Sequence, residues 1–210
     1  MTGVAALWFA LALTVAVGDW LAVHAGRRTV EYVAKPLTMV LLIGAALALD
    51  PVDPAVRVAF VVALAFSLAG DIFLMLPRDL FVAGLASFLI GHLAYITGLQ
   101  LRGQSGGWFV LGLVVVLAVI LVVGVRIVRA VRADDDALAV PVTAYLAVIS
   151  LMVASAFGTG NGFAIAGALL FYASDAMIAW NRFVQPHPWA RVAIMTTYHL
   201  GQFGLVLSLV

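Results

Sequence analysis

The sequence predicts an all-α protein, a polytopic membrane helix bundle of about eight transmembrane helices, and three observations lead to this prediction. Of its 210 residues, 65% are hydrophobic and only 10% are charged, and the mean hydropathy is +1.18. One water-soluble core cannot bury so much apolar surface, so lipid is the expected solvent. The apolar residues also fall into runs of about 20, the helix length that crosses the hydrocarbon layer, and polar stretches separate these runs.

The spans are expected, in chain order, at approximately residues 4–24, 33–49, 55–77, 79–101, 107–126, 137–157, 160–181 and 189–210. They are separated by the stretches AGRRTVE, DPVDP, LPRD, RGQSGG, RIVRAVRADDD, GTGNG and NRFVQPHPWAR. These stretches form turns or carry charge, which lipid does not tolerate outside a helix. The first run lacks the basic start and the cleavage site of a signal peptide, so it is predicted to be the first membrane helix. All spans are expected to form a single transmembrane domain over residues 1–210.

The basic residues are distributed unequally between the two ends of the predicted bundle. Two of them, Arg57 and Arg102, lie on the side of the even-numbered loops. The side of the loops after the first, third, fifth and seventh spans holds the other nine: Arg27, Arg28, Lys35, Arg78, Arg126, Arg129, Arg132, Arg182 and Arg191. Because cytoplasmic loops are enriched in Lys and Arg, this side is expected to face the cytoplasm, with both termini outside and the protein in the plasma (inner) membrane.

Composition and motifs exclude several classes of function. The net charge of +1, from 11 basic and 10 acidic residues, argues against a nucleic-acid partner. The absence of cysteine excludes thiol catalysis, disulfides and iron–sulfur ligation. The chain also lacks the motifs G-x-S-x-G, H-E-x-x-H and G-x-x-x-x-G-K-[ST], which argues against a serine hydrolase elbow, a zinc protease and a P-loop. No cofactor is expected, and the sequence does not indicate an oligomeric state.

Ionisable side chains inside the spans are the strongest indication of function. A charge at mid-bilayer costs on the order of 2.5 to 3.5 kcal/mol, so each of these groups needs a partner, water or a proton. They are Asp19, Lys35, Asp71, His92, Asp175 and His199. At ~1.5 Å per helical residue, Asp71, Asp175 and His199 are expected roughly 9 to 12 Å below the cytoplasmic face. Asp19 is expected at a similar depth, Lys35 nearer the surface and His92 nearer mid-membrane, which predicts a single cavity open to the cytoplasm.

Structural explanations stand beside the functional ones. Lys35 can extend its ammonium to the interface, and Asp19 can pair with Arg27 or Arg28 as a topological anchor. A membrane histidine often forms a neutral hydrogen bond between helices, which applies to His92 and His199. Other polar groups are able to orient a substrate or water, although packing also explains the tyrosines: Tyr95, Tyr172, Tyr198, Asn181 and Gln202.

Asp71 and Asp175 are the candidates hardest to explain structurally. Each lies more than a helical turn inside a span and next to a small residue, Gly70 or Ser174. Two carboxyls facing one dry cavity do not both ionise readily, so one is expected to hold a proton near neutral pH, which suits acid–base chemistry. A metal bound by Asp71, Asp175, His92 and His199 is chemically allowed, but no local ligand spacing supports it, and none is expected.

Two segments suggest an internal duplication. The stretch LAGDIFLMLPRDLF around Asp71 is similar to YASDAMIAWNRFVQ around Asp175, and each is followed about two dozen residues later by a His-Leu pair, at His92 and His199. Both lie in helices of the same predicted direction, so two parallel four-helix repeats are one explanation. Chance similarity within a low-diversity membrane sequence is the other.

Several motifs together resemble a known family. They are KPLTM (35–39), GDIFLMLP (70–77), FxxGLxxFLIGHLxYI (81–96), SDAMIAWNRF (174–183) and YHLGQ (198–202). In this order, over most of the chain, they resemble the YhhN family of membrane proteins, which includes the lysoplasmalogenases. The resemblance implies hydrolysis of the vinyl ether bond of a lysophospholipid substrate, with release of a fatty aldehyde and a glycerophospho-head group.

The site expected on this basis combines the resemblance with the buried polar residues. Asp71 and Asp175 are expected to be the catalytic pair, in unassigned order, by analogy with glycosidases. His92 and His199 are expected to orient water or relay protons, and Lys35 to meet the substrate phosphate. Asp19, Tyr95, Tyr198 and Asn181 are the further expected substrate-binding residues. The alternatives are a proton-coupled transporter or carrier of a lipid or amphiphile, and a non-catalytic scaffold or lipid sensor.

Overall fold

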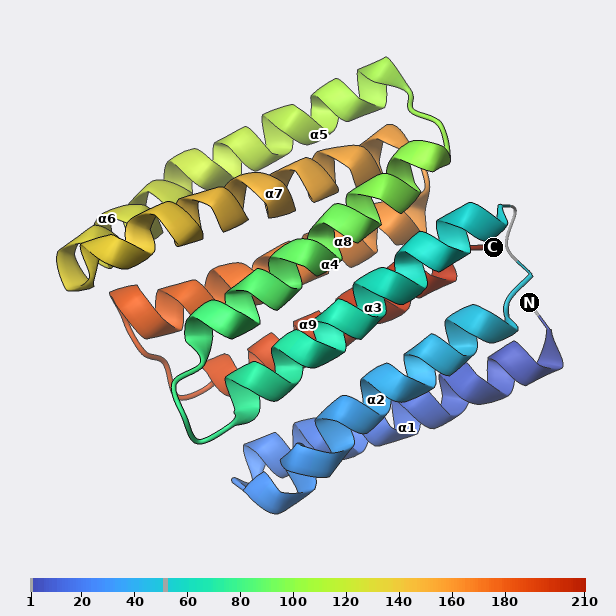
Figure 1. Ribbon diagram of the computed structural model, residues 1–210, viewed down its shortest axis with the longest axis horizontal. Coiled ribbons are helices and arrows are strands. Elements are labelled where there is room, and N and C mark those ends of the chain that lie inside the picture. Colours follow the sequence, from blue (N-terminus) through green and yellow to red (C-terminus); the bar gives the residue numbers. More distant parts are fainter. Residues whose placement is uncertain (1, 51–52) are drawn as a thin grey trace.

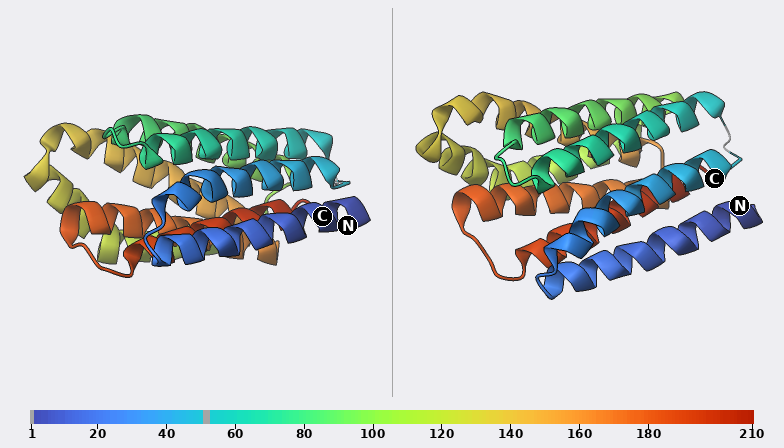
Figure 2. Two further views of the ribbon diagram at one scale, coloured as in Figure 1. Left: turned by 90° about the horizontal axis from the view of Figure 1, so that it is seen from below. Right: turned by 60° about the horizontal axis from the view of Figure 1, so that its bottom comes forward.

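The protein folds into a bundle of long helices that run along one shared direction (Figures 1 and 2). The computed structural model describes residues 2–50 and 53–210, and it assigns no strand within them. The helical elements are α1 (Gly3–His24), α2 (Arg28–Ala48), α3 (Pro54–Met75), α4 (Phe81–Leu101), α5 (Gly106–Val119), η1 (Ile120–Gly124), α6 (Val125–Asp134), η2 (Asp136–Leu138), α7 (Ala139–Gly158), α8 (Gly162–Ala179), η3 (Trp180–Val184) and α9 (Ala190–Leu207). Elements α5, η1 and α6 are continuous, as are η2 with α7 and α8 with η3, so the predicted helical bundle is confirmed.

Among the described residues, seven helices are long and apolar enough to cross a membrane. The last helix, α9, is not one of these seven, and its polar side chains Arg191, His199 and Gln202 explain the difference. It packs against α8, α1 and α2 and buries many of its residues, so protein rather than lipid surrounds much of its surface. The large exposed side chains of α1 and α5, such as Leu7 and Leu117, are apolar, as expected of a lipid-facing surface.

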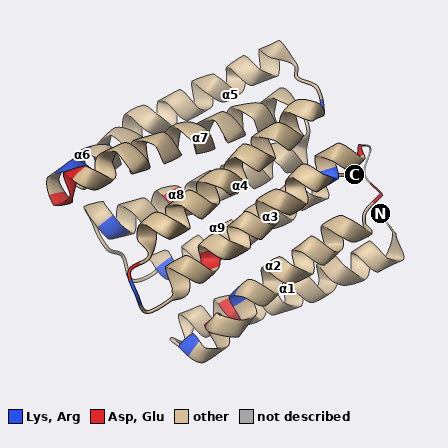
Figure 3. Cartoon of the chain, in the orientation of Figure 1, with Lys and Arg blue, Asp and Glu red and all other residues tan. Residues whose placement is uncertain are grey.

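Both termini lie at one end of the bundle (Figures 1 and 2). The turn between α1 and α2, the loop between α3 and α4, the turn after α6 and the loop between η3 and α9 meet at the opposite end. We call this opposite end the basic end, because Arg27, Arg78, Arg132 and Arg182 lie on or beside these loops, and Figure 3 shows several blue segments of the chain there. The predicted separation of the basic residues is therefore present in three dimensions.

The stretch RIVRAVRADDD was predicted to be a loop, and this prediction was wrong. The fifth span continues through the π-helix η1 into α6 and ends at Asp134. Ile127 and Val131 are buried in a small cluster with Phe81 and Val142, while the arginines of the same helix, Arg126, Arg129 and Arg132, are exposed. This amphipathic pattern lets the helix leave the membrane without ending, because one face stays packed and the other meets water.

Turn chemistry explains where two helices begin. Gly26 and Gly160 adopt positive φ angles of 67° and 65° in the turns before α2 and α8, a conformation that glycine tolerates without steric cost. The Asn161 side chain then accepts a hydrogen bond of 3.0 Å from the backbone N–H of Ala164, which caps α8. The remaining helix boundaries differ from the predicted ones by a few residues.

Small residues allow the closest helix contacts. Gly167 of α8 faces Gly201 and Gly204 of α9, where an added Cβ at Gly167 would lie only 2.6 Å from the backbone nitrogen of Leu205. The core between the helices is also rich in alanine, including Ala16, Ala63 and Ala168. Such contacts bring helix axes close together, and this places side chains from several helices within hydrogen-bonding distance.

Candidate functional site

Asp71 lies in a buried polar contact among three helices. Lys35 of α2 places its ammonium nitrogen 3.1 Å from Asp71 Oδ1, and the Tyr198 hydroxyl of α9 donates a hydrogen bond of 2.6 Å to Asp71 Oδ2. Lys35 and Asp71 are 6% and 1% exposed, so Lys35 does not extend to the interface. A buried carboxylate that has both a cation and a hydroxyl donor is well suited to remain charged.

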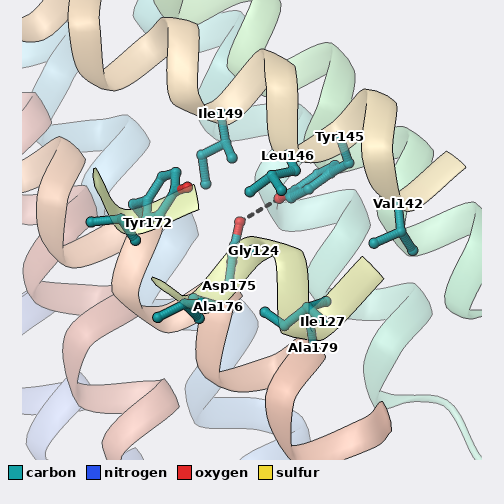
Figure 4. Close-up of a pocket in the computed structure, with 12 residues that line it drawn as sticks. Gly124, Ile127, Val142, Tyr145, Leu146, Ile149, Tyr172, Asp175, Ala176 and Ala179 are labelled. Atoms are coloured by element: carbon teal, nitrogen blue, oxygen red, sulfur yellow. Dashed lines mark hydrogen bonds between the residues drawn. The ribbon is translucent and has the colours of Figure 1, made fainter. Parts of the chain in front are cut away.

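Asp175 lies in a second polar contact, between α8, α7 and α4. Figure 4 shows the part of this contact that α8 and α7 form. The Tyr145 hydroxyl of α7 donates a short hydrogen bond to Asp175 Oδ2. His92 of α4 places Nε2 3.8 Å from the same oxygen. The His92 Nδ1 lies 2.5 Å from the carbonyl oxygen of Phe88, which only accepts, so Nδ1 carries the proton and Nε2 of the neutral ring is an acceptor. Asp175 thus has no cation comparable to Lys35 among its direct contacts.

The two contacts follow the same pattern. Each carboxylate is on the helix of one predicted motif and meets a side chain from the helix that follows the other motif, Tyr198 for Asp71 and His92 for Asp175. The residues three positions after the two histidines, Tyr95 and Gln202, are hydrogen-bonded to each other at 2.5 Å. This reciprocal arrangement is the one that a duplicated four-helix unit would give, and the duplication itself stays a prediction.

A third group of buried polar side chains lies between α1 and α9. The Trp20 indole donates a hydrogen bond of 3.0 Å to His199 Nδ1, which leaves the proton of a neutral His199 on Nε2. Neither His199 Nε2 nor either carboxylate oxygen of Asp19 has a hydrogen-bond partner in the described part of the chain. Within residues 2–50 and 53–210, Asp19 also forms no ion pair with Arg27 or Arg28, so it is not the anchor considered above.

A cavity of about 400 Å³ opens at the basic end. Its polar wall consists of Glu31, Lys35, Asn181, Arg182 and Arg191, and its apolar wall consists of Leu74, Phe81, Ile178, Ile194 and Met195. We call it the basic-end cavity. Asn181 and Arg182 reach it from the π-helix η3, an irregular turn of a type frequent at functional sites. The volume is within the range of small-molecule binding sites.

Two narrow apolar slots of about 40 and 50 Å³ adjoin Asp175. Tyr145 and Asp175 line both slots, and aliphatic side chains form most of their remaining surface (Figure 4). The larger slot shares Leu74, Phe81 and Ile178 with the basic-end cavity, so these three side chains separate the cavity from the carboxyl. Asp71 lines neither slot, and its link to the cavity is Lys35, which lines the cavity and contacts Asp71.

Two ion pairs lie at the mouth of the cavity. Arg182 forms a two-point pair with Asp79, at 2.8 and 3.3 Å, and its guanidinium stacks 4.3 Å from the Phe81 ring centroid. Arg191 Nη2 lies 2.9 and 2.7 Å from the two carboxylate oxygens of Glu31. The hydrogen bonds from Arg182 lower the pKa of the exposed Asp79 below its ordinary value of 3.8. Each of the two arginines is therefore paired with a carboxylate.

The predicted residues do not all converge on one point. The structure brings Lys35, Asp71 and Tyr198 into one contact and His92 and Asp175 into another. His199 accepts a hydrogen bond from Trp20, and Asp19 is buried without a hydrogen-bond partner in the described part of the chain. Tyr95 is buried against Gln202 and Phe60, and Asn181 lines the basic-end cavity. Among the described residues, no three His, Asp or Glu side chains form a group that could hold a metal ion.

Sequence reasoning missed Tyr145, Trp20, Glu31, Arg182 and Arg191. Tyr145 is a single tyrosine in an apolar helix, and nothing local distinguishes it from a packing residue. The repeat would not have identified it either, because K-P-L-T at residues 35–38 corresponds to V-P-V-T at residues 140–143 and so matches Lys35 with Val140. The arginines were assigned only to topology, because their role at the cavity depends on the path of η3 and α9.

An all-helical membrane bundle with two buried carboxyls and an amphiphilic cavity at one end is a polytopic membrane protein with a polar site inside its spans. Comparison with known proteins identifies its family. A model of the YhhN family matches residues 30–209, so the chain belongs to the YhhN family, as its motifs predicted.

Named relatives add to this assignment. The chain is 35% identical over 146 residues to lysoplasmalogenase TMEM86B of Homo sapiens, a match that covers 70% of this chain and 61% of the relative. It is 31% identical over 166 residues to a lysoplasmalogenase of Mycobacterium tuberculosis, covering 77% of this chain and 63% of the relative. The match thus spans less than two thirds of these relatives. No solved structure matches the chain significantly.

Proposed function

We propose that the protein hydrolyses the vinyl ether bond of lysoplasmalogens, releasing a fatty aldehyde and a glycerophospho-head group. The observation that carries the proposal is the pair of buried carboxyls with unequal partners beside an amphiphilic cavity. The names of the relatives support the same reaction. The cavity suits a lysophospholipid, because its charged wall fits a head group and its apolar wall fits the start of the chain.

The unequal surroundings support different roles for the two carboxyls. Asp71 is paired with Lys35 and accepts a hydrogen bond from the Tyr198 hydroxyl, so it is the one kept as a carboxylate. Asp175 faces apolar slots and the acceptor nitrogen of His92, and two acceptors in proximity favour a proton on one of them. Asp175 is therefore the proton donor, with Tyr145 and His92 as positioning residues.

The reaction balances with one water molecule and no other reagent. Protonated Asp175 gives its proton to the carbon of the vinyl ether double bond that is not bonded to oxygen, which leaves an oxocarbenium ion. Water adds to the cationic carbon and loses a proton, which reaches the Asp175 carboxylate directly or by way of Asp71 and so regenerates the acid. The resulting hemiacetal breaks its bond to the glycerol oxygen, giving aldehyde and alcohol. Asp71 stabilises the cation electrostatically or accepts the proton of the water, as the second carboxylate of a glycosidase does.

The test is aldehyde release from a 1-alkenyl lysophospholipid by purified protein in detergent. Asp71→Asn and Asp175→Asn keep the side-chain shape and are expected to abolish turnover. Asp175→Asn should unfold close to wild type, whereas Asp71→Asn leaves the buried Lys35 ammonium without its carboxylate and is therefore also assayed together with Lys35→Met. Asp134→Asn, an exposed carboxyl at the end of α6, is the matched control and keeps its activity. Turnover retained by either of the first two variants would refute its catalytic role. Because detergent abolishes any gradient, aldehyde formation also distinguishes a hydrolase from a carrier.

We further propose that the basic end faces the cytoplasm in the plasma membrane, with both termini outside. The distribution of arginines in the loops supports this orientation. The substrate head group would then enter the basic-end cavity from the cytoplasmic leaflet.

A further inference from the structure

The charges in the basic-end cavity are arranged as a pair of opposite sign. Arg191 of α9 and Glu31 of α2 both line the cavity and form an ion pair with each other. The Glu31 side chain is only 14% exposed, whereas that of Arg191 is 47% exposed. One guanidinium nitrogen makes both contacts to Glu31, so the other nitrogens of Arg191 remain available as donors.

A ligand that opens this pair must satisfy both partners. A simple anion would bind Arg191 but would leave the carboxylate of Glu31 beside it without a cation, which disfavours binding. A zwitterion that carries a phosphate and an ammonium presents both charges and replaces the internal pair with two new ones. Lys35 and Arg182 line the same cavity, which adds positive charge on the phosphate side.

The apolar wall indicates what the zwitterion is attached to. Leu74, Phe81 and Ile178 line both the cavity and the slot that leads to Asp175. A head group bound among the charges would therefore direct an attached hydrocarbon chain along these side chains, past the carboxyl. A free phosphate compound would leave this wall uncovered.

We propose that the basic-end cavity recognises the head group of a lysophospholipid as a zwitterion, with Arg191 binding the phosphate and Glu31 binding the ammonium as their own ion pair opens. The inference rests on the proposed function for its substrate class and assigns the residues that select the head group. Arg182 and Asp79 form a second pair at the mouth, and Asp79 is too exposed to select strongly.

The test measures binding rather than turnover. The probes are 1-O-alkyl lysophospholipids, which lack the vinyl ether bond, in two forms: one with an ethanolamine head group and one with phosphate alone. Ligand-induced shifts in thermal unfolding, converted to dissociation constants in detergent, compare them. Glu31→Gln is expected to weaken the ethanolamine form by about ten- to a hundred-fold and to leave the phosphate form unchanged or tighter. Arg191→Gln is expected to weaken both forms by a similar factor.

Arg129→Gln is the matched control, because Arg129 is an exposed arginine on α6 that does not line the cavity. Arg191→Lys keeps the positive charge and is expected to retain the preference for the ethanolamine form. The unfolding temperature without ligand separates a loss of binding from a loss of folding.

Equal effects of Glu31→Gln on the two lipid forms would overturn the proposal, as would binding of glycerophosphoethanolamine without a chain as tightly as the full lipid. Because no probe is hydrolysed, these results are independent of the reaction. A protein that shows the expected head-group selection but releases no aldehyde would contradict the proposed function and leave this inference standing.

Discussion

The position of Lys35 alone does not reveal its role, which depends on its partner in the bundle. A lysine near a helix start is able to reach water, yet its ammonium points into the bundle and meets Asp71. The ion pair is surrounded by Tyr198 and Met39, since the tyrosine hydroxyl contacts both the carboxylate and the Met39 sulfur, at 2.6 and 3.4 Å. Lys35 therefore compensates a buried charge, which makes its removal costly.

Replacing Lys35 alone should destabilise the protein more than removing both charges. Lys35→Met leaves the Asp71 carboxylate without its cation, and breaking a buried pair in this way costs about 3 to 5 kcal/mol. The double variant Lys35→Met with Asp71→Asn carries no unpaired charge and should recover much of that loss. Thermal unfolding in detergent measures both variants. Equal stability of the single and double variants would show that the pair does not compensate the buried charge.

The two tyrosines should each control one carboxyl. Tyr198→Phe removes the hydroxyl that binds Asp71, and Tyr145→Phe removes the one that binds Asp175. A hydrogen bond to a charged group contributes roughly 1.5 to 3 kcal/mol, so each variant is expected to lower kcat by about ten- to a hundred-fold. Tyr32→Phe, on the exposed face of α2, is the control and should not change kcat in the aldehyde assay. Full activity of Tyr145→Phe would show that Tyr145 does not position Asp175 for the reaction.

At the scale of the element, two features of α8 and α9 position the site. Gly167 and Gly201 let the two helices approach closely, which sets the positions of Asp175 on α8 and of Tyr198 on α9. The π-helix η3 then widens the end of α8 and turns Asn181 and Arg182 toward the basic-end cavity. The close contact between α8 and α9 therefore positions the carboxyl contacts, and the irregular turn η3 positions the polar wall of the basic-end cavity.

Gly167→Ala should separate α8 from α9. An added Cβ would lie 2.6 Å from the Leu205 nitrogen and 2.8 Å from the Gly201 carbonyl oxygen, and backbone atoms cannot move aside as a flexible side chain can. Overpacking of this kind typically costs about 1 to 3 kcal/mol. We expect a lower unfolding temperature in detergent together with reduced aldehyde release. Gly18→Ala is the matched control, since nothing lies within 4 Å of the Cβ it adds, and comparable losses in both variants would refute the packing explanation.

At the scale of the whole molecule, both termini lie at the same end of the bundle, and this constrains the membrane topology. Both termini lie opposite the basic end, so they must occupy the same side of a membrane (Figure 3). The basic loops then predict which side this is, because translocation of positively charged short loops is disfavoured. The head-group cavity opens at the basic end, so orientation also determines which leaflet supplies the substrate.

The orientation predicts the behaviour of reporter fusions in a bacterial host. Alkaline phosphatase joined after Val210 should be active, and green fluorescent protein at the same position should be dark, because the C-terminus is expected outside the cytoplasm. A fusion truncated in the loop after Asp79 should show the opposite pattern. Fluorescence from the C-terminal fusion would place the basic end outside and contradict the proposed cytoplasmic entry of substrate.

Part of the site followed from the sequence and part did not. Asp71, Asp175, His92 and Lys35 stood out because ionisable groups inside apolar runs need an explanation, and each of them lies in a buried polar contact. Tyr145 did not stand out, although it contacts Asp175 directly, since a tyrosine in an apolar helix is as common in packing as in catalysis. The charges of residues 126–136 predict a loop, but the four-residue spacing of Ile127 and Val131 gives the segment a buried face, and it stays helical to Asp134.

The sequence by itself determined the helical membrane class, the order of the spans, the two unequal ends and the family. These properties depend on the hydropathy and charge of the residues, which add up along the chain whatever contacts the residues make. Only the tertiary structure decided that Lys35 pairs with Asp71 while Tyr145 and His92 meet Asp175, and that Arg191 and Glu31 share a cavity. Those contacts depend on how each helix is rotated about its axis and how closely small residues let it pack, and no single span specifies either quantity.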